Sequence, residues 1–223
     1  VDAEKISNWK NKVVEKLTKG PGQLSKARKI EYIRGKASFK SKEELLVKNE
    51  EGEESILTFE SVIIATGSSP VALPSIEFDH ELIIDSTDAL ELKEVPKSML
   101  VIGGGYIGLE LGSVYSALGA KVSIAEMTSG YLPGADRDLI KVFEKESKGL
   151  FEEVYFDTAV KEAKAEKKQV KATLENGDQS EEISFNKVLV AVGRKPNSDG
   201  IGLEKAGVET DDKGFIKVDT ERR

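Results

Sequence analysis

The segment from residue 99 to residue 126 constrains the fold more strongly than any other part of the chain. Residues 99–102 are an apolar run that is too short for a helix and leads into a cluster of glycines, a pattern typical of a buried strand. Gly103, Gly105 and Gly108 then have the spacing G-x-G-x-x-G. This combination predicts a strand, a tight turn and a helix in immediate succession.

The residues that follow continue this pattern. Ile107, Leu111, Val114 and Leu118 recur at helical spacing and predict the inner face of a helix that ends near Gly119. Residues 121–125 are predicted to be a second short strand, and it leads directly to Glu126. An acidic residue about 20 positions beyond the glycines completes the pattern of a dinucleotide-binding βαβ unit.

Each of these residue types has a physical role in such a unit. Gly103 allows the tight turn, Gly105 lets a pyrophosphate approach the backbone, and Gly108 lets the helix pack closely on the strand. The N–H groups at the helix start favour an anion. Glu126 is placed to bind ribose hydroxyls and would repel a 2′-phosphate, so NAD is expected rather than NADP. A glycine-rich turn without a ligand is the alternative.

Composition narrows the remaining classes of function. The chain has 223 residues and a net charge of −7, which argues against nucleic acid or an anionic membrane as its main partner. No apolar run approaches the roughly 20 residues of a membrane span, and the first residues do not have the pattern of a signal peptide. A soluble, cytoplasmic protein is expected.

Cysteine is absent and histidine occurs once. Without cysteine, this chain can form no disulfide, thiolate metal site or redox dithiol, and no metal site is expected. His80 lies in a polar segment, where a solvated loop residue is expected rather than a general base.

The first third of the chain combines one helix with short strands. Ile6, Trp9 and Leu17 follow helical spacing, with the tryptophan expected in the core, and the glycines and proline of residues 19–22 are expected to end the helix. Strands of an antiparallel meander are then predicted at residues 30–33, 37–39, 45–48 and 55–59. Residues 62–65 are predicted to be a buried parallel strand that ends in a glycine turn.

Beyond residue 70 the pattern is that of an α/β domain. Residues 70–96 are expected to connect two domains, with a helix N-cap at residues 85–88. A helix from residue 136 is expected to turn Leu139, Val142 and Phe143 inward. Further strands are predicted at residues 152–156, 169–174, 182–185, 187–192 and 215–218. The strands at residues 169–174 and 182–185 are expected to form a hairpin. The fold class is therefore α/β and Rossmann-like, with parallel strands, helices and an antiparallel meander.

Three motifs in this order resemble the flavin-dependent pyridine nucleotide-disulfide oxidoreductases, and within that family the dihydrolipoamide dehydrogenases. They are Ile-Ala-Thr-Gly at residues 64–67, Gly-Gly-Gly-Tyr-Ile-Gly-Leu-Glu at residues 103–110, and Gly-Arg-Lys-Pro-Asn at residues 193–197. The resemblance implies a homodimeric enzyme that passes electrons from the dihydrolipoamide of a 2-oxo acid dehydrogenase complex, through a cysteine pair and FAD, to NAD.

The resemblance also implies which residues bind these cofactors. For NAD they are Gly103, Gly104, Gly105, Tyr106, Ile107 and Gly108 around the pyrophosphate, Glu126 at the ribose, Val160 beside the adenine, and Glu110, Ala191 and Gly193 near the nicotinamide. For FAD they are Ala37, Thr66, Gly67 and Ser68, acting mostly through the backbone.

Several family features are not found in this sequence, namely the first glycine fingerprint, the cysteine pair and the catalytic histidine. The chain is therefore expected to be an internal segment that binds NAD but, by itself, has no catalytic residue and does not reduce lipoamide. The expected domains are the end of an FAD-binding domain at residues 1–69, an NAD-binding domain at 70–197 and the start of a central domain at 198–223.

Two alternatives stay open at the level of the sequence. One is another enzyme of the superfamily, such as a mercuric or glutathione reductase, a transhydrogenase or an NADH oxidase. Residues 127–130 supply no cation, which argues against the NADPH-dependent members. The other is a regulatory module that senses NAD without any chemistry.

Overall fold

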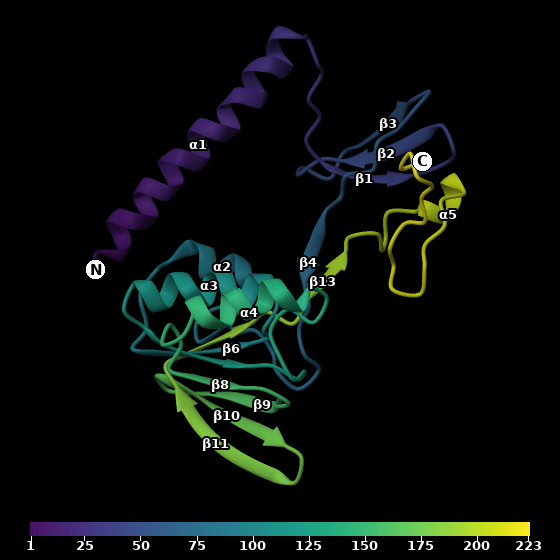
Figure 1. Ribbon diagram of the computed structural model, residues 1–223. Helices are drawn as coiled ribbons and strands as arrows, with labels where there is room; N and C mark the ends of the chain where they lie inside the picture. The colour runs from purple at the N-terminus through teal and green to yellow at the C-terminus, as the bar shows by residue number, and fades with distance from the viewer. The chain divides into compact units, whose positions relative to one another are not determined.

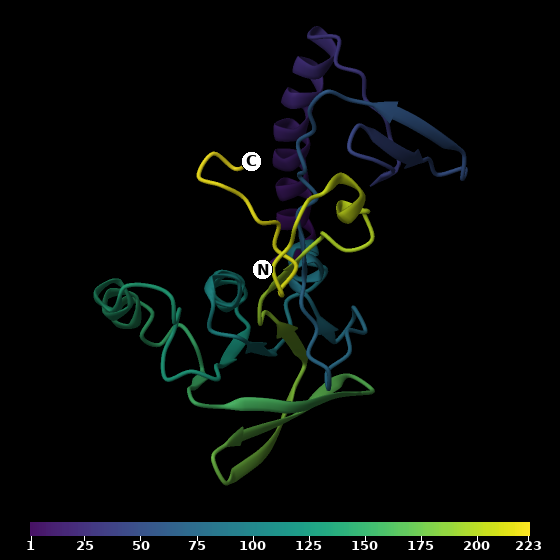
Figure 2. The same cartoon turned by 90° about the vertical axis from the view of Figure 1, so that its right-hand side faces the viewer.

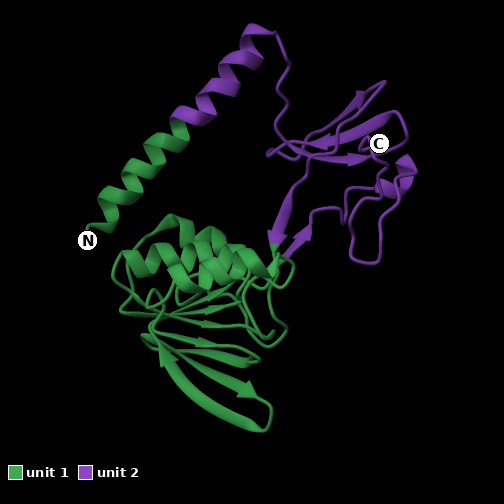
Figure 3. Ribbon diagram, viewed as in Figure 1, with its two compact units in different colours: residues 1–15, 70–193 green, residues 16–69, 194–223 purple.

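The computed structural model describes residues 1–223 (Figure 1). The chain separates into two compact units (Figure 3): unit 1 comprises residues 1–15 and 70–193, and unit 2 comprises residues 16–69 and 194–223. Helix α1 (Ala3–Ala27) contributes residues to both units.

Unit 1 is built on a parallel sheet whose strand order is β5-β12-β6-β7-β8. Its strands are β5 (Ile83–Ile84), β6 (Ser98–Ile102), β7 (Lys121–Ala125), β8 (Glu153–Tyr155) and β12 (Lys187–Val190). The strands predicted around residues 99–102, 121–125, 152–156 and 187–192 are thereby confirmed, and every pairing between them is parallel.

Two layers cover the faces of this sheet. Helices α2 (Ser86–Glu91), α3 (Tyr106–Ala117) and α4 (Arg137–Glu146) lie on one face (Figure 1). An antiparallel sheet of β9 (Ala159–Glu166), β10 (Gln169–Asn176) and β11 (Gln179–Phe185) lies on the other, as Figure 2 shows from the side. The hairpin predicted for residues 169–185 is confirmed.

Alternation along β6 explains why an unbroken apolar run is needed there. Met99 and Val101 belong to the core beneath the helices, whereas Leu100 and Ile102 belong to the core facing the antiparallel sheet. Because side chains of a strand point alternately to opposite faces, a strand covered on both faces must be apolar at every position.

Residues 70–96 form part of unit 1 rather than a simple connection. Ile76 is fully buried, and β5 extends the parallel sheet by pairing with β12. Asp85 caps α2 as predicted, because its carboxylate accepts hydrogen bonds from the N–H groups of Thr87 and Asp88. The helix pattern was found correctly, but the contribution of β5 to the sheet was not expected.

The predicted inner faces of two helices are confirmed only in part. Leu111, Leu118 and Phe143 pack against the core beneath the helices as expected, but other positions differ. Helix α3 buries Gly108, Leu109, Gly112 and Tyr115, whereas Val114 is exposed. The face of α3 that contacts the sheet follows its two glycines, which bring the helix backbone close to the sheet. Glycine carries no apolar signal in the sequence. Helix α4 likewise buries Ile140 and exposes the two residues 139 and 142 that were expected inside.

Helix α1 differs from its prediction in two respects. It continues through Pro21 to Ala27, although a proline inside a helix removes one backbone hydrogen bond and its ring crowds the preceding turn. Trp9 is 68% exposed rather than in the core. In unit 1, Ile6 packs against the helix-side core, and the Lys10 ammonium donates to the Leu90 carbonyl oxygen at the end of α2.

Unit 2 contains the predicted antiparallel meander. Strands β1 (Lys36–Phe39), β2 (Glu44–Lys48) and β3 (Glu54–Thr58) pair in order, whereas residues 30–33 form no strand. The short helix α5 (Leu203–Ala206) begins after Gly202, where an added Cβ would lie 2.7 Å from the Phe39 carbonyl oxygen.

Two further strands predicted for unit 2 are not formed. Residues 62–65 pair with no strand of the chain, and Ile63 is 92% exposed. Residues 215–218 contribute only an isolated bridge between Thr210 and Ile216. The short strands β4 (Ser68–Pro70) and β13 (Arg194–Pro196) pair with each other instead.

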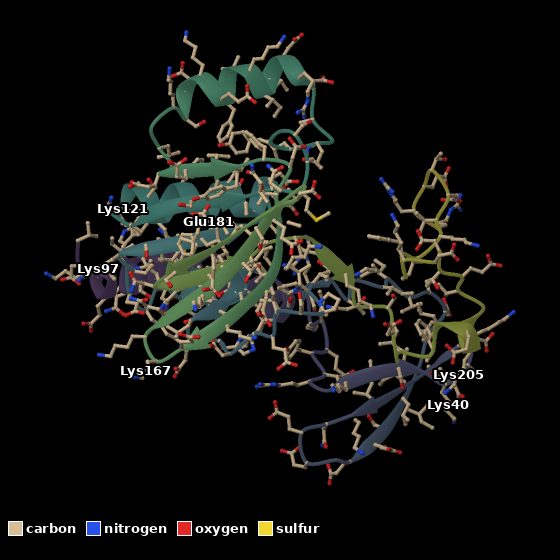
Figure 4. All side chains as sticks on the ribbon, turned by 90° about the horizontal axis from the view of Figure 1, so that it is seen from below. Lys40, Lys97, Lys121, Lys167, Glu181 and Lys205 are labelled. Carbon is tan, nitrogen blue, oxygen red and sulfur yellow. The ribbon has the colours of Figure 1, made fainter.

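Charged side chains are distributed over the surface. Lys97, Lys121 and Lys167 lie at the periphery of unit 1 (Figure 4), and the Lys121 ammonium is 2.7 Å from the Glu152 carboxylate. None of the helices combines the length and apolar character required to cross a membrane.

Candidate functional site

The glycine turn between β6 and α3 is the most constrained backbone segment of unit 1. Gly103 has a φ of +111°, and an added Cβ there would lie 2.5 Å from the Ala191 carbonyl oxygen. A Cβ on Gly108 would lie 2.2 Å from the Gly103 carbonyl oxygen. Both positions therefore require glycine for the turn to form and for the helix to reach the sheet.

Gly105 has a different environment. No atom lies within 4 Å of a Cβ built on it, and its φ is −77°, so neither crowding nor backbone strain inside the chain demands glycine. It is the N-cap of α3, where no side chain accepts a hydrogen bond from the first N–H groups. Open space beside uncapped N–H groups is suited to an anion.

Glu126 follows β7 and reaches back to this turn. Its Oε2 accepts a hydrogen bond of 2.6 Å from the Gly104 N–H, and its Oε1 accepts bonds of 2.8 Å and 2.9 Å from the N–H and hydroxyl of Thr128. The carboxylate is thus held beside the glycine turn, with its charge at the edge of the sheet.

The loop after Glu126 returns to the same peptide. The Leu132 N–H donates to the Gly104 carbonyl oxygen at 3.0 Å. Arg137 holds this loop together, because its guanidinium donates to the carbonyl oxygens of Tyr131 at 3.1 Å, of Ala135 at 2.9 Å, and of Leu132. Sequence analysis missed Thr128 and Arg137. The only local signal for Thr128 is a hydroxyl residue two positions after an acid, a common turn pattern.

Three other predicted residues lie on α3. Tyr106 opens the helix and is largely exposed, Ile107 is half-buried, and Glu110 is exposed one turn further along. The structure therefore places them on the helix that begins at the glycine turn.

The remaining predicted NAD residues lie on neighbouring elements. Ala191 approaches the turn closely, since its N–H donates to the Ile102 carbonyl oxygen at 2.8 Å. Gly193 is exposed with a φ of +142°. Val160 is only 9% exposed and packs in the core that faces the antiparallel sheet, so its side chain is not brought to the glycine turn.

The residues predicted to contact FAD belong to unit 2. The Asn197 amide donates to the Thr66 carbonyl oxygen, the Asn197 N–H donates to that of Gly67, and the Arg194 guanidinium donates to the Ser68 hydroxyl. Residues 66–68 are thus joined to residues 194–197, whereas Ala37 lies in a different sheet, on β1.

A second polar cluster surrounds the single histidine. His80 is exposed, and its Nδ1 lies 2.8 Å from the Asp88 Oδ2. This hydrogen bond and the charge of Asp88 raise the pKa of His80. Burial acts to raise the pKa of Asp88, but hydrogen bonds from His80 and the Asp85 N–H lower it overall. Asp85 and Asp88 together could contribute metal ligands with His80, but both carboxylates already cap α2.

Comparison with known proteins gives a consistent result. A family model described as pyridine nucleotide-disulphide oxidoreductase matches residues 2–223. The chain is 42% identical over 223 residues to a dihydrolipoyl dehydrogenase of Vibrio parahaemolyticus, covering 100% of this chain and 46% of the relative. It is 41% identical over 221 residues to a protein of the same name from Buchnera aphidicola, covering 98% of this chain and 46% of the relative.

Two solved structures share the fold of this chain. The copper(II) complex of the HOCl-induced flavoprotein disulfide reductase RclA from Escherichia coli matches with a TM-score of 0.85 at 29% identity, covering 96% of this chain and 48% of that one. LpdA from Mycobacterium tuberculosis matches with a TM-score of 0.89 at 21% identity, covering 98% of this chain and 48% of that one. At this identity the match supports the fold alone. The chain spans about half the length of these relatives.

Proposed function

Because the chain belongs to the pyridine nucleotide-disulphide oxidoreductase family, we propose that unit 1 binds NAD as part of a dihydrolipoyl dehydrogenase-like enzyme. The observation that carries this proposal is the open space at Gly105 beside the uncapped start of α3, with the Glu126 carboxylate fixed next to it.

The residues present fit both halves of an ADP moiety. The N–H groups at the start of α3 would bind the pyrophosphate, with the help of the helix dipole. The Glu126 carboxylate keeps acceptor capacity for the adenosine ribose hydroxyls, and its negative charge would repel a 2′-phosphate. These features support NAD rather than NADP.

Bound NAD would supply the acceptor for a hydride. Around it, we propose that Ala191 and Gly193 border the nicotinamide half, that Glu110 contacts the carboxamide, and that Tyr106 covers the nicotinamide position until the cofactor arrives. Val160 would contribute to the adenine side through its backbone, because its side chain is buried.

Unit 2 does not by itself present a site that fits FAD. The carbonyl oxygens of residues 66–68 and the Ser68 hydroxyl are engaged by Arg194 and Asn197. We derive no step through FAD from these residues. Dihydrolipoyl dehydrogenases and flavoprotein disulfide reductases, the relatives found, work with FAD and NAD(H).

We propose the same cofactors for a longer protein that includes this chain. Such a protein would act as a homodimer on the dihydrolipoamide of a 2-oxo acid dehydrogenase complex. This chain has no cysteine, so we propose that alone it binds NAD without reducing lipoamide. Residues 1–69, 70–197 and 198–223 would belong to the FAD-binding, NAD-binding and central domains.

Titration calorimetry with NAD⁺ tests the nucleotide site. The variant Gly105→Val places a branched side chain where the pyrophosphate would lie and should weaken binding at least about tenfold, or about 1.4 kcal/mol. Gly134→Val is the matched control, because Gly134 also has no atom within 4 Å of an added Cβ. It should bind NAD⁺ as the unaltered chain does.

Thermal melting of both variants shows whether each remains folded. The proposal would be wrong if the unaltered, folded chain did not bind NAD⁺, or if the two valine variants bound it equally well.

A further inference from the structure

Thr128 contributes the only side chain that donates a hydrogen bond to Glu126. Its hydroxyl oxygen lies 2.9 Å from the Glu126 Oε1, and its N–H donates to the same oxygen at 2.8 Å. The hydroxyl also lies 3.0 Å from the Gly130 carbonyl oxygen. A hydroxyl has one hydrogen, and a carboxylate is the stronger acceptor, so donation to Glu126 is favoured.

The backbone around this pair is fixed on both sides. The Asp157 N–H donates to the Thr128 carbonyl oxygen at 3.1 Å, and the Thr158 N–H donates to that of Glu126 at 3.0 Å. The Glu126 N–H in turn donates to the Tyr155 carbonyl oxygen at 2.9 Å. Because both backbones are anchored to the segment that follows β8, the Thr128 hydroxyl is directed at the carboxylate before any ligand binds.

The two carboxylate oxygens consequently have different surroundings. Oε1 receives two hydrogen bonds from Thr128, whereas Oε2 receives one from Gly104. This arrangement fixes the plane of the carboxylate beside the glycine turn. A carboxylate fixed in this way needs little reorganisation to accept ribose hydroxyls, and preorganisation of this kind increases affinity.

We propose that Thr128 is a positioning residue for Glu126 and, through it, sets the preference for a nucleotide with a free ribose 2′-hydroxyl over one with a 2′-phosphate. This inference rests on the proposed NAD site. It assigns to Thr128 an effect on nucleotide selectivity, beyond its contribution to the fold of the loop.

The test compares Thr128→Val and Thr128→Ser in the full 223-residue chain, with NAD⁺ and NADP⁺ titrated separately by calorimetry. Valine keeps the shape and removes the hydroxyl, and it should weaken NAD⁺ binding about fivefold, within the range for loss of a typical hydrogen bond. NADP⁺ binding should change less, because its 2′-phosphate is not held by Glu126. The affinity ratio therefore falls, and serine restores it.

Ser129→Ala is the matched control in the same loop, and it should leave both affinities unchanged. If Thr128→Val does not fold, as judged by thermal melting, Thr128→Ala carries the test. Equal loss of NAD⁺ and NADP⁺ affinity, or no change in either, would overturn the positioning role. Failure of the unaltered chain to bind NAD⁺ would instead refute the proposed function on which it rests.

Discussion

Residues 99–102 and 62–65 are two short apolar runs that end in glycine turns, yet only the first forms a strand. The first run forms β6, which pairs with β12 on one side and β7 on the other, and its Met99 and Leu100 are fully buried. The second pairs with no strand of the chain and leaves Ile63 exposed. An apolar run therefore becomes a buried strand only where neighbouring strands supply hydrogen bonds and two covering layers supply contacts.

The glycines that follow these runs differ in the same way. Gly103 and Gly67 both have positive φ, at +111° and +70°. Around Gly103 the carbonyl oxygen of Ala191 leaves no room for a side chain, whereas nothing lies within 4 Å of a Cβ on Gly67. The turn at Gly103 is therefore packed between elements of the core, whereas the turn at Gly67 has open space where a side chain would lie.

The largest expected difference is in how much each of the two apolar runs contributes to the free energy of unfolding. Leu100→Ala should lower the free energy of unfolding by about 2–5 kcal/mol, because it leaves a cavity in a closely packed core. Ile63→Ala should change it by less than about 0.5 kcal/mol, since an exposed side chain loses little on truncation. Urea denaturation followed by circular dichroism measures both. Similar costs for the two variants would show that residues 62–65 are packed in solution.

A smaller difference is expected at the two turns. Gly67→Ala should cost about 1–3 kcal/mol from backbone strain alone. Gly103→Ala should cost about 1–3 kcal/mol more than that, because its Cβ also collides with a backbone oxygen. The same denaturation experiment applies, with the unaltered chain as reference. If Gly67→Ala proved the more costly variant, the turn at residue 67 would have to be the more crowded of the two.

The smallest effect concerns the edge of the parallel sheet. The backbone N–H of His80 donates to the Ile83 carbonyl oxygen at the start of β5. The pair of His80 with Asp88 therefore supports a strand that has only one neighbour in the sheet. Asp88 raises the pKa of His80 above its ordinary value of 6.5. The stabilisation is therefore complete below that value and is lost as the pH rises through the raised pKa.

The difference in melting temperature between the unaltered chain and His80→Gln measures this contribution. This difference should be larger at about pH 5.5 than at about pH 9. It should shrink again in strong acid, because Asp88 becomes protonated. A difference that grew from the lower to the higher of these two pH values would contradict the assignment.

Much of unit 1 was predictable from the sequence alone. The apolar runs of residues 99–102 and 187–192, the glycine spacing and the cap at Asp85 depend on local geometry and on alternation along a strand. Such signals lie within a few residues of one another, so the amino-acid order contains them. The family could be identified for the same reason, because its motifs are short and occur in a characteristic order.

Tertiary structure alone decided the rest. Helix α3 presents its glycines rather than Val114 to the sheet because close approach of the backbone, not apolar character, sets its contact line. Thr128 and Arg137 surround the candidate site because a loop folds back onto Gly104. Residues 62–65 stay unpaired because strand formation depends on partners elsewhere in space. These outcomes arise from contacts between segments distant in the chain, which residue spacing does not encode.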